Sequence, residues 1–247
     1  MATVSSKSKR GSCQQVQMSS TDISLDRNTI RIPASAGTHA GFRAWTTSDE
    51  FPAHVRATFV NQEIFLDMSG EELETHNALK FEMTIVLGPL SRELKVGRYF
   101  PDGAQVSNRA VGFTSIPDGV LVTKASLQSG RIRMVPRKKR KGQYIELEGT
   151  PDWVMEIVSD SSAYKDTQEL RQAYHKAGVF EYWLIDARGE EIRFQILQNR
   201  RAGYVAAPNR GGWQYSRVFN RSFRLERHRD DLGLWEYTLH VQPVNRA

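Results

Sequence analysis

One apolar segment near the middle of the chain carries a carboxylate inside what reads as a buried strand. The segment TPDWVMEIVSD, residues 150–160, is rich in Trp, Val, Met and Ile but is interrupted by Glu156. Side chains alternate between the two faces of a strand. One face is assigned to the core and carries Trp153, Met155 and Ile157. The other mixes carboxylates with valines, as a half-buried site does, at Asp152, Val154, Glu156 and Val158.

Glu156 has two interpretations. In the first, it is an ordinary strand residue on a solvated face, satisfied by an arginine. In the second, it is a metal ligand or a general base, because a desolvated carboxylate needs a cation or a proton beside it. The second interpretation requires a partner for Glu156.

A divalent metal normally takes a second carboxylate. Asp152 lies four residues away, which is about 13 Å along a strand. Two oxygens that far apart cannot hold one Mg²⁺ at its ligand distance of roughly 2.1 Å. Asp118 is the better candidate, because Pro117 places it at the start of the strand predicted over residues 119–123. The sequence therefore predicts that Asp118 and Glu156 face one cleft from neighbouring strands.

The elements around this pair predict an α/β domain with a mixed sheet and few helices. Residues 54–68 suit two strands around Asn61-Gln62, and residues 71–94 suit a helix that Gly88-Pro89 interrupts or ends. Residues 166–178 predict a second helix. Its start is assigned to a capping box of Asp166 and Glu169, and its end to Gly178. Its inner stripe is Leu170, Ala173, Tyr174 and Ala177. Strands at 181–187 and 191–197 follow, joined by a turn at Arg188-Gly189.

The ends of the chain differ from its middle in composition. Residues 1–40 are rich in Ser, Thr, Gln and Lys and lack apolar periodicity, so we expect a disordered tail there. The expected domain covers residues 41–241, and residues 242–247 form a short C-terminal tail. No apolar run follows Lys7, Lys9 and Arg10, so no secretory signal is expected.

Composition narrows the setting of the protein. The single Cys13 cannot form an internal disulfide, and no Cys/His grouping has zinc spacing. No stretch reaches the roughly 18 apolar residues of a membrane span. We therefore expect a cytoplasmic protein with no membrane partner. The net charge of +6 favours polyanionic partners.

Two basic regions add to that expectation. The first carries five consecutive cations at Arg137, Lys138, Lys139, Arg140 and Lys141, in a stretch that suits an exposed hairpin or loop. The second, residues 199–229, holds eight arginines against one acid, Glu226. A charged run is usually only a solvated loop, but two such regions in one domain favour phosphate contacts. DNA is the expected partner, and a homodimer is left open.

The motifs between Pro151 and Asp186 resemble those of the Uma2 family, also called DUF820, of restriction-endonuclease-like proteins. The similarity covers about residues 42–239 and rests on PDWVMEIVSDSS, the following KD and Tyr, and AGVFEYWLIDARG. The resemblance implies a PD-(D/E)xK nuclease fold, with a mixed central sheet flanked by helices and a Mg²⁺ or Mn²⁺ site at its open edge.

Carried over by motif, Asp118 and Glu156 would be the two acidic metal ligands, and His76 would match the helical histidine of the family. His76 also lies on an apolar stripe, where core packing is the competing interpretation. The early glutamate of the family falls on Thr58 here, while Glu63 is retained. Ser159 and Asp166 would support the site.

The chain departs from the family where a lysine is expected. Related nucleases place it at the position of Val158, and this family places it at Leu170. Lys165 and Arg171 are near enough to substitute, and Lys165 is favoured because it would lie just outside the predicted helix. The leading hypothesis is a Mg²⁺-dependent endonuclease acting on DNA, with Asp118, Glu156 and Lys165 as catalytic residues. The alternatives are a nucleic-acid-binding module that has lost cleavage and a protein-interaction module.

Overall fold

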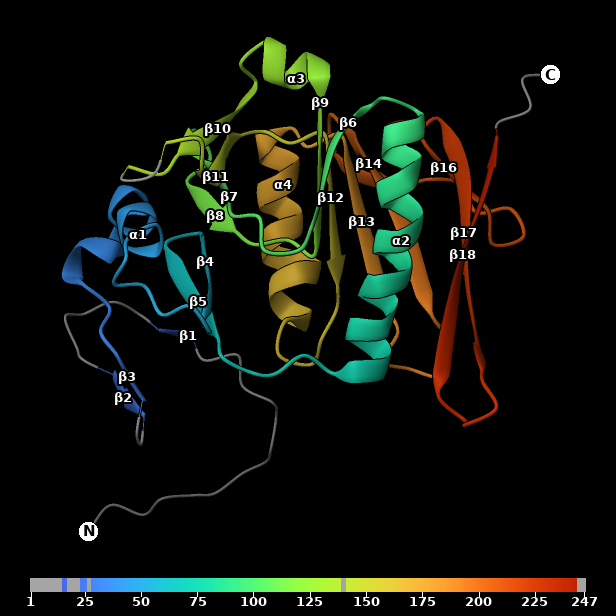
Figure 1. Cartoon of the computed structure of the whole chain (residues 1–247), viewed down its shortest axis with the longest axis horizontal. Coiled ribbons are helices and arrows are strands. Elements are labelled where there is room, and N and C mark those ends of the chain that lie inside the picture. Colours follow the sequence, from blue (N-terminus) through green and yellow to red (C-terminus); the bar gives the residue numbers. More distant parts are fainter. Residues whose placement is uncertain (1–14, 17–22, 26–27, 139–140, 244–247) are drawn as a thin grey trace.

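A six-stranded mixed sheet forms the centre of the computed structural model, which describes residues 15–16, 23–25, 28–138 and 141–243 (Figure 1). The strand order is β15-β14-β13-β12-β9-β6. The strands span Gly97–Pro101 (β6), Gly119–Thr123 (β9), Trp153–Ile157 (β12), Glu181–Asp186 (β13), Arg193–Arg200 (β14) and Gly203–Ala206 (β15). The pair β12–β13 is parallel and every other pair in this sheet is antiparallel, so the sheet is mixed, as expected.

Strand β12 buries both of its faces. The apolar face packs on a core with Leu79, Met83 and Leu87, and that core includes Trp153, Met155 and Ile157. Val154 and Val158 belong to a second core on the other side of the sheet, together with Leu170 and Tyr174. The predicted division of the strand into two faces is therefore confirmed. The face of Glu156 is more buried than predicted, because Glu156 is only 3% exposed.

One helix covers each of these faces. On one side lies the helix made of η2 (Leu73–Asn77) and α2 (Ala78–Glu93). It continues through Pro89, so the prediction that Gly88-Pro89 could end it is wrong. A proline removes one N–H and clashes with the carbonyl one turn earlier, and buried Leu79, Met83 and Leu87 hold the helix on the core despite that loss. On the other side lies the helix made of η3 (Lys165–Leu170) and α4 (Arg171–Ala177), which links parallel strands β12 and β13.

The start of the second helix differs from the prediction. Asp166 lies inside η3 and donates its backbone N–H to the carbonyl of Ser162, so it is not the N-cap. Ser159 and Ser162 make reciprocal bonds instead, each hydroxyl accepting the other residue's N–H at 3.2 and 3.0 Å. These reciprocal bonds form a capping box at Ser159 and Ser162, earlier in the chain than the predicted one. The end is as predicted, because Gly178 has φ 82° in the left-handed region.

A second, seven-stranded sheet lies beside the first in the order β1-β5-β4-β8-β7-β11-β10. Its strands span Gln15–Val16 (β1), Arg56–Val60 (β4), Glu63–Asp67 (β5), Val106–Asn108 (β7), Phe113–Ser115 (β8), Ile132–Pro136 (β10) and Tyr144–Gly149 (β11). The predicted hairpin β4–β5 is confirmed, and Asn61 and Gln62 turn it with φ of 50° and 66°.

Short elements complete the chain. They are β2 (Ile23–Leu25), β3 (Asn28–Ile30), η1 (Ala34–Gly37), α1 (His39–Thr46) and α3 (Lys124–Gln128). A three-stranded sheet of β16 (Gln214–Ser216), β17 (Arg221–Arg229) and β18 (Trp235–Pro243) packs beside α2. Buried Glu181 ties this sheet to the central one by accepting bonds from the Ser216 hydroxyl and the Val218 N–H, at 2.8 and 2.9 Å.

The expected tail boundaries are only partly within the described residues. Residues 1–14, 17–22, 26–27 and 244–247 lie outside them. Within the described part, η1 and the start of α1 fall before residue 41, and α1 buries Phe42 and Trp45 in a small core with Phe59. Residues 242 and 243 belong to β18. The folded part of the chain therefore extends beyond residues 41–241 at both ends.

Candidate active site

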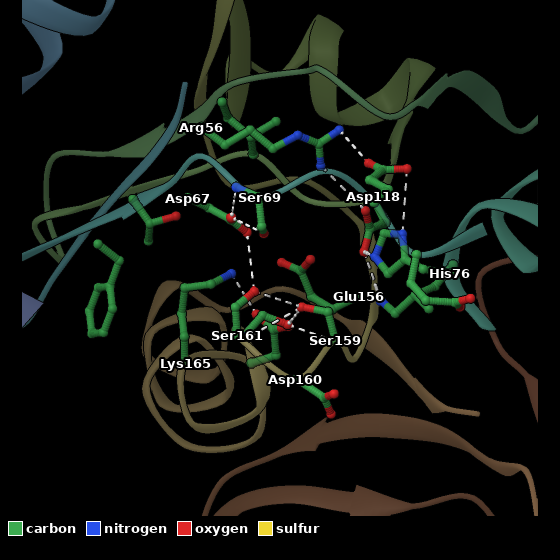
Figure 2. A pocket seen from close by; sticks show the side chains of 18 of the residues that line it. Arg56, Asp67, Ser69, His76, Asp118, Glu156, Ser159, Asp160, Ser161 and Lys165 are labelled. Atoms are coloured by element: carbon green, nitrogen blue, oxygen red, sulfur yellow. Dashed lines mark hydrogen bonds and ion pairs between the residues drawn. The ribbon is translucent and has the colours of Figure 1, made fainter. Parts of the chain in front are cut away.

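Asp118 and Glu156 come together where neighbouring β9 and β12 stop pairing. The antiparallel ladder of these strands ends with the pair Gly119 and Met155, and Asp118 and Glu156 are the next residues of the two segments. The Asp118 carboxylate accepts the N–H of Ile157, the residue after Glu156, at 2.8 Å. Both side chains line one cavity of about 470 Å³ (Figure 2). The structure thus brings together the two carboxylates that the sequence singled out.

Several segments wall this cavity. They are the hairpin β4–β5 with the loop to η2, His76 within η2, the residues just before β9, the end of β12 with the serine-rich turn 159–162, and the start of η3. Thr58, where the family's early glutamate was expected, also lines it. The acidic lining residues are Asp67, Glu71, Glu72, Asp118, Glu156, Asp160 and Asp166. Only Arg56 and Lys165 among the lining residues are fixed cations, so the cavity attracts further positive charge.

Asp118 is held as a carboxylate by the groups around it. Its Oδ2 accepts the backbone N–H of Ile157 at 2.8 Å and lies 3.4 Å from His76 Nε2. Its Oδ1 lies 2.9 Å from Lys80 Nζ. Burial by itself would raise the pKa of Asp118, but the bond from His76 and the charges of His76 and Lys80 lower it well below its ordinary value. Asp118 is therefore ionised and already oriented.

The pKa of Glu156 is shifted in the opposite direction to that of Asp118. Its Oε1 accepts the hydroxyl of Tyr174 at 2.7 Å, and that hydroxyl also contacts Ser115 Oγ at 2.9 Å. Burial raises the pKa of Glu156 well above 4.5, and the nearby charge of Asp166 raises it further. No arginine in the described part of the chain forms an ion pair with Glu156, so the simple salt-bridge interpretation does not hold. A buried carboxyl of this kind becomes a carboxylate when a cation arrives beside it.

Lys165 lies in the same cavity, close to Glu156. Its Nζ contacts Asp166 Oδ1 at 2.6 Å, and its side chain is 15% exposed. Burial lowers the pKa of Lys165, but the charges of Asp166 and Glu156 outweigh that and leave the pKa raised. Arg171 does not line the cavity. Of the two substitutes for the expected lysine, the structure brings only Lys165 to the carboxylates, while Val158 and Leu170 are buried in the core.

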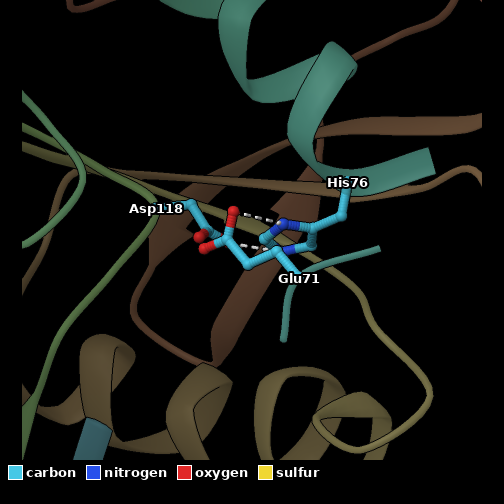
Figure 3. A group of neighbouring side chains, drawn as sticks. All are labelled: Glu71, His76 and Asp118. Carbon is cyan, nitrogen blue, oxygen red and sulfur yellow. Dashed lines mark ion pairs between the residues drawn. The ribbon is translucent and has the colours of Figure 1, made fainter. Parts of the chain in front are cut away.

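His76 completes a group that can bind a metal. Glu71, His76 and Asp118 each offer a ligand atom, and these atoms lie within 4.8 Å of one another (Figure 3). His76 Nδ1 is buried and has no hydrogen-bond partner in the described structure; its nearest acid oxygen, Glu71 Oε2, is 3.5 Å away. A buried polar atom without a partner needs an explanation, and imidazole with two carboxylates is a donor set that suits Mn²⁺ and, through its oxygens, Mg²⁺.

Sequence reasoning did not find four charged residues of this site: Arg56, Glu71, Lys80 and Asp102. Arg56 Nη2 lies 2.9 Å from Glu71 and 2.6 Å from Asp102, and Lys80 Nζ lies 2.6 Å from Glu71. One signal was available, because His76 and Lys80 are four residues apart and so share one face of a helix. Nothing in the spacing of the other three marks them.

Asp152 has a structural role at the far end of β12. It accepts the N–H of Thr123 and the hydroxyl of Ser126, both at 2.7 Å, and so fixes the start of α3. The argument that Asp152 is too distant to pair with Glu156 is thus consistent with its contacts. Tyr174, Tyr182 and Trp183 are core residues, and Asp186 accepts the N–H of Arg188 in the turn.

Of the basic stretch, Arg137, Lys138 and Lys141 are described, and they lie between β10 and β11 and do not line the cavity. Arg137 contacts Asp49 at 3.1 Å. Lys139 and Arg140 lie outside the described residues. In the second basic region, Arg227 bonds to backbone carbonyls of residues 187, 189 and 190, and Arg229 contacts Glu74 at 3.3 Å. Both rest on Trp235, with guanidinium carbons 4.0 and 3.6 Å from its ring centroid. These two arginines are structural.

The central mixed sheet, the helix on each of its faces and the acidic pair at its inner strands β9 and β12 define a restriction-endonuclease-like fold. The solved structure of "a putative nuclease belonging to DUF820 from Anabaena variabilis ATCC 29413" is similar to this chain, with a TM-score of 0.53 and 16% identity. The match covers 74% of this chain and 90% of that one. At this identity, the likeness concerns the fold alone.

The sequence assigns the family. The model of the Uma2 family, described as "Putative restriction endonuclease", matches residues 40–228, well over half of the chain. The protein therefore belongs to the Uma2 family. No curated protein matches it. No helix within the described residues combines the length and the apolar character that crossing a bilayer requires.

Proposed function

We propose that this protein is a divalent-metal-dependent endonuclease that hydrolyses phosphodiester bonds in DNA. The observation that carries the proposal is the meeting of Asp118, Glu156 and Lys165 in one acidic cavity. Two carboxylates and a lysine in one cavity are what hydrolysis of a phosphodiester needs: anchors for a cation, and a positive charge for the phosphate in the transition state. Membership of the Uma2 family supports the same reaction class.

The metal would be Mg²⁺ or Mn²⁺, with Asp118 and Glu156 as ligands. Glu71 and His76 extend the donor set, since their ligand atoms lie near those of Asp118. A divalent ion supplies a Lewis acid that lowers the pKa of water and offsets the charge developing on phosphate.

The residues of the chain have separate tasks in this proposal. Asp118 is already ionised and oriented by the Ile157 N–H. Lys165 neutralises the phosphate oxygens as water attacks phosphorus and the P–O bond to the leaving hydroxyl breaks. Asp166 fixes the Lys165 ammonium, and Ser159 shapes the turn that leads to it. Arg137, Lys138, Lys139, Arg140 and Lys141 would contact the DNA backbone outside the cavity.

The test is a cleavage assay with the full-length chain on supercoiled plasmid, linear duplex and single-stranded DNA, in Mg²⁺, Mn²⁺ or EDTA. We expect metal-dependent cleavage that Asp118→Asn and Glu156→Gln abolish. The exposed Glu190→Gln is the matched control, which changes the same charge away from the cavity. Cleavage that survives in EDTA, or in either cavity variant, would rule the proposal out.

A second candidate is a DNA-binding module without cleavage. It is favoured by Val158 and Leu170, which stand where a lysine is expected and are both buried. In that case, the chain would bind DNA with a salt-dependent affinity but would cleave none of the three substrates in any metal.

A further inference from the structure

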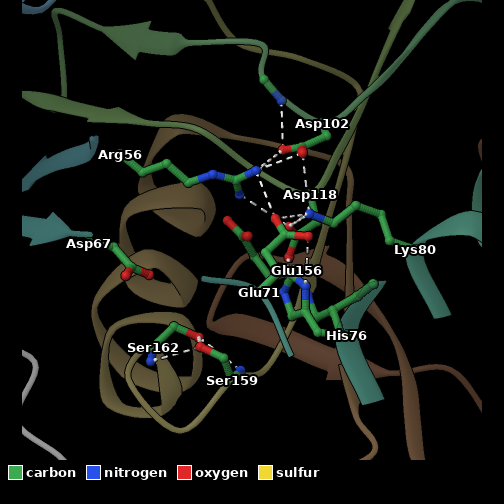
Figure 4. A network of polar contacts seen from close by, with 12 residues as sticks. Arg56, Asp67, Glu71, His76, Lys80, Asp102, Asp118, Glu156, Ser159 and Ser162 are labelled. Carbon is green, nitrogen blue, oxygen red and sulfur yellow. Dashed lines mark hydrogen bonds and ion pairs between the residues drawn. The ribbon is translucent and has the colours of Figure 1, made fainter. Parts of the chain in front are cut away.

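Lys80 is a buried cation surrounded by carboxylates (Figure 4). Its Nζ lies 2.6 Å from Glu71 Oε1, 2.9 Å from Asp118 Oδ1 and 3.3 Å from Asp102 Oδ2. An ammonium group has three N–H donors, so these three acids account for all of them. The side chain is only 9% exposed, which leaves little access for a substrate phosphate. Lys80 therefore acts within the site.

Glu71 and Asp118, the two carboxylates of the group in Figure 3, each place one oxygen near Lys80 and the other near His76. Glu71 gives Oε1 to Lys80, while its Oε2 lies 3.5 Å from His76 Nδ1. Asp118 gives Oδ1 to Lys80, while its Oδ2 lies 3.4 Å from His76 Nε2. The same cation thus contacts both carboxylates on the side away from the imidazole.

Asp102 takes part in this arrangement without belonging to the metal-capable group. It adopts φ 62°, which is uncommon for a residue other than glycine. Its N–H donates to the Asp118 carbonyl at 3.1 Å, and its carboxylate contacts both Lys80 and Arg56. The turn is therefore fixed to the strand that carries Asp118, and it holds the two cations against the acids.

The charges of this cluster balance almost completely without a metal. Three carboxylates, Glu71, Asp102 and Asp118, face two fixed cations, Arg56 and Lys80. Carboxylates this close together, with Asp118 buried and Glu71 and Asp102 half-buried, would repel one another without the cations. Something must hold them in place before a metal arrives.

We propose that Lys80 is an internal cation that holds Glu71 and Asp118 together in the metal-free protein and competes with the divalent ion for them. This inference rests on the proposed function, because it takes Glu71, His76 and Asp118 to lie at the metal site. Two consequences follow. The fold does not depend on the metal, and metal affinity is lower than the acidic residues alone would give.

The experiment compares wild type with Lys80→Met by thermal melting in EDTA and by calorimetric titration with Mn²⁺ and Mg²⁺. We expect Lys80→Met to melt lower in EDTA, to bind Mn²⁺ roughly tenfold more tightly because one repelling charge is gone, and to gain more thermal stability from the metal than wild type gains. Lys176→Met, on the exposed side of α4, is the matched control and should change none of these. Lys80→Gln keeps hydrogen-bond donors without the charge and replaces the methionine variant if that one does not fold.

The outcomes separate the inference from the function. A lower melting temperature with unchanged or weaker Mn²⁺ affinity would show that Lys80 is a structural ion pair only, and would overturn the inference while leaving the metal site in place. An unchanged melting temperature in EDTA would overturn it as well. If wild type and both variants bind no metal, the proposed function fails, and the inference fails with it.

Discussion

The acidic cavity and the basic hairpin tip are both rich in charged residues but use them differently. In the cavity, Asp118 and Glu156 are buried and Lys165 is half-buried, and each is fixed by named partners. At the tip of β10–β11, Arg137 has one contact with an exposed acid, Asp49. Buried charges must be paired, so their positions are set by the fold. Exposed charges act through their sum and are screened by salt. Substitutions in the cavity should therefore change chemistry and stability, and those at the tip should change only the salt dependence of binding.

Asp118→Asn should have the largest effect. This change removes the buried carboxylate that Lys80 and His76 contact, while the cations Arg56 and Lys80 remain. We therefore expect the free energy of unfolding to fall by about 3 kcal/mol, as when one partner is removed from a buried ion pair. Metal-dependent cleavage should also be lost. Urea unfolding in EDTA measures the first effect, and Glu190→Gln serves as control. A variant as stable as wild type would mean that the cluster contributes nothing to the fold.

Glu156→Gln should abolish cleavage but should not destabilise the metal-free protein. The pKa of Glu156 in the folded state is raised by burial, so the wild-type carboxyl stabilises the fold fully below about pH 4.5 and loses that contribution as the pH rises toward its folded pKa. A glutamine does not ionise, so the variant does not lose stability in this pH range through position 156. Its melting temperature in EDTA should therefore match or exceed that of wild type, with a difference that grows as the pH rises from 4.5. Added Mg²⁺ should stabilise wild type only.

The two variants should differ in stability although both acids are buried in one cavity, because Asp118 is held by the cation Lys80 and Glu156 by the hydroxyl of Tyr174. A melting temperature of Glu156→Gln clearly below that of wild type in EDTA would indicate a structural ion pair for Glu156. Together with no stabilisation of wild type by Mg²⁺, that result would exclude a catalytic role for this residue.

Lys165→Met should reduce cleavage by about 100- to 1000-fold, as for removal of one group that stabilises transition-state charge. Arg171→Met is the matched control and should cleave nearly as well as wild type, because Arg171 does not line the cavity. The measurement is the initial rate on plasmid DNA in Mg²⁺. The reverse result, with Arg171→Met inactive and Lys165→Met active, would reassign the cation.

Replacing Arg137, Lys138, Lys139, Arg140 and Lys141 together by glutamine should have the smallest effect on the folded protein. Each phosphate contact that is lost should lower the slope of log affinity against log salt by about 0.9. The melting temperature should not change. Fluorescence anisotropy with a labelled duplex over a salt series measures the slope, and Lys176→Gln is the single-charge control. A slope equal to that of wild type would make the hairpin tip an ordinary solvated surface.

Local patterns were enough for several strands, for the two long helices and for the acidic pair, but not for the cap of the second helix or for the path of the first through Pro89. Strand β12 follows from its alternation, the hairpin β4–β5 from Asn61-Gln62, and the end of α4 from Gly178, since each depends on a few neighbouring residues. Asp118 and Glu156 could be paired because each belongs to a strand with an identifiable position. The predicted cap at Asp166 failed because its carboxylate is used by Lys165 and because the serines before it already supply the cap.

The composition of the charged cluster depends on the three-dimensional fold. Arg56 comes from β4, Glu71 from the loop before η2, Lys80 from α2 and Asp102 from the turn after β6. No spacing in the chain relates these residues, because they meet only when two sheets and a helix pack around one cavity. The need for counter-charges follows from the sequence, since buried carboxylates require them. Which cations supply them, and at what distances, follows only from the packing of segments that are far apart in the chain.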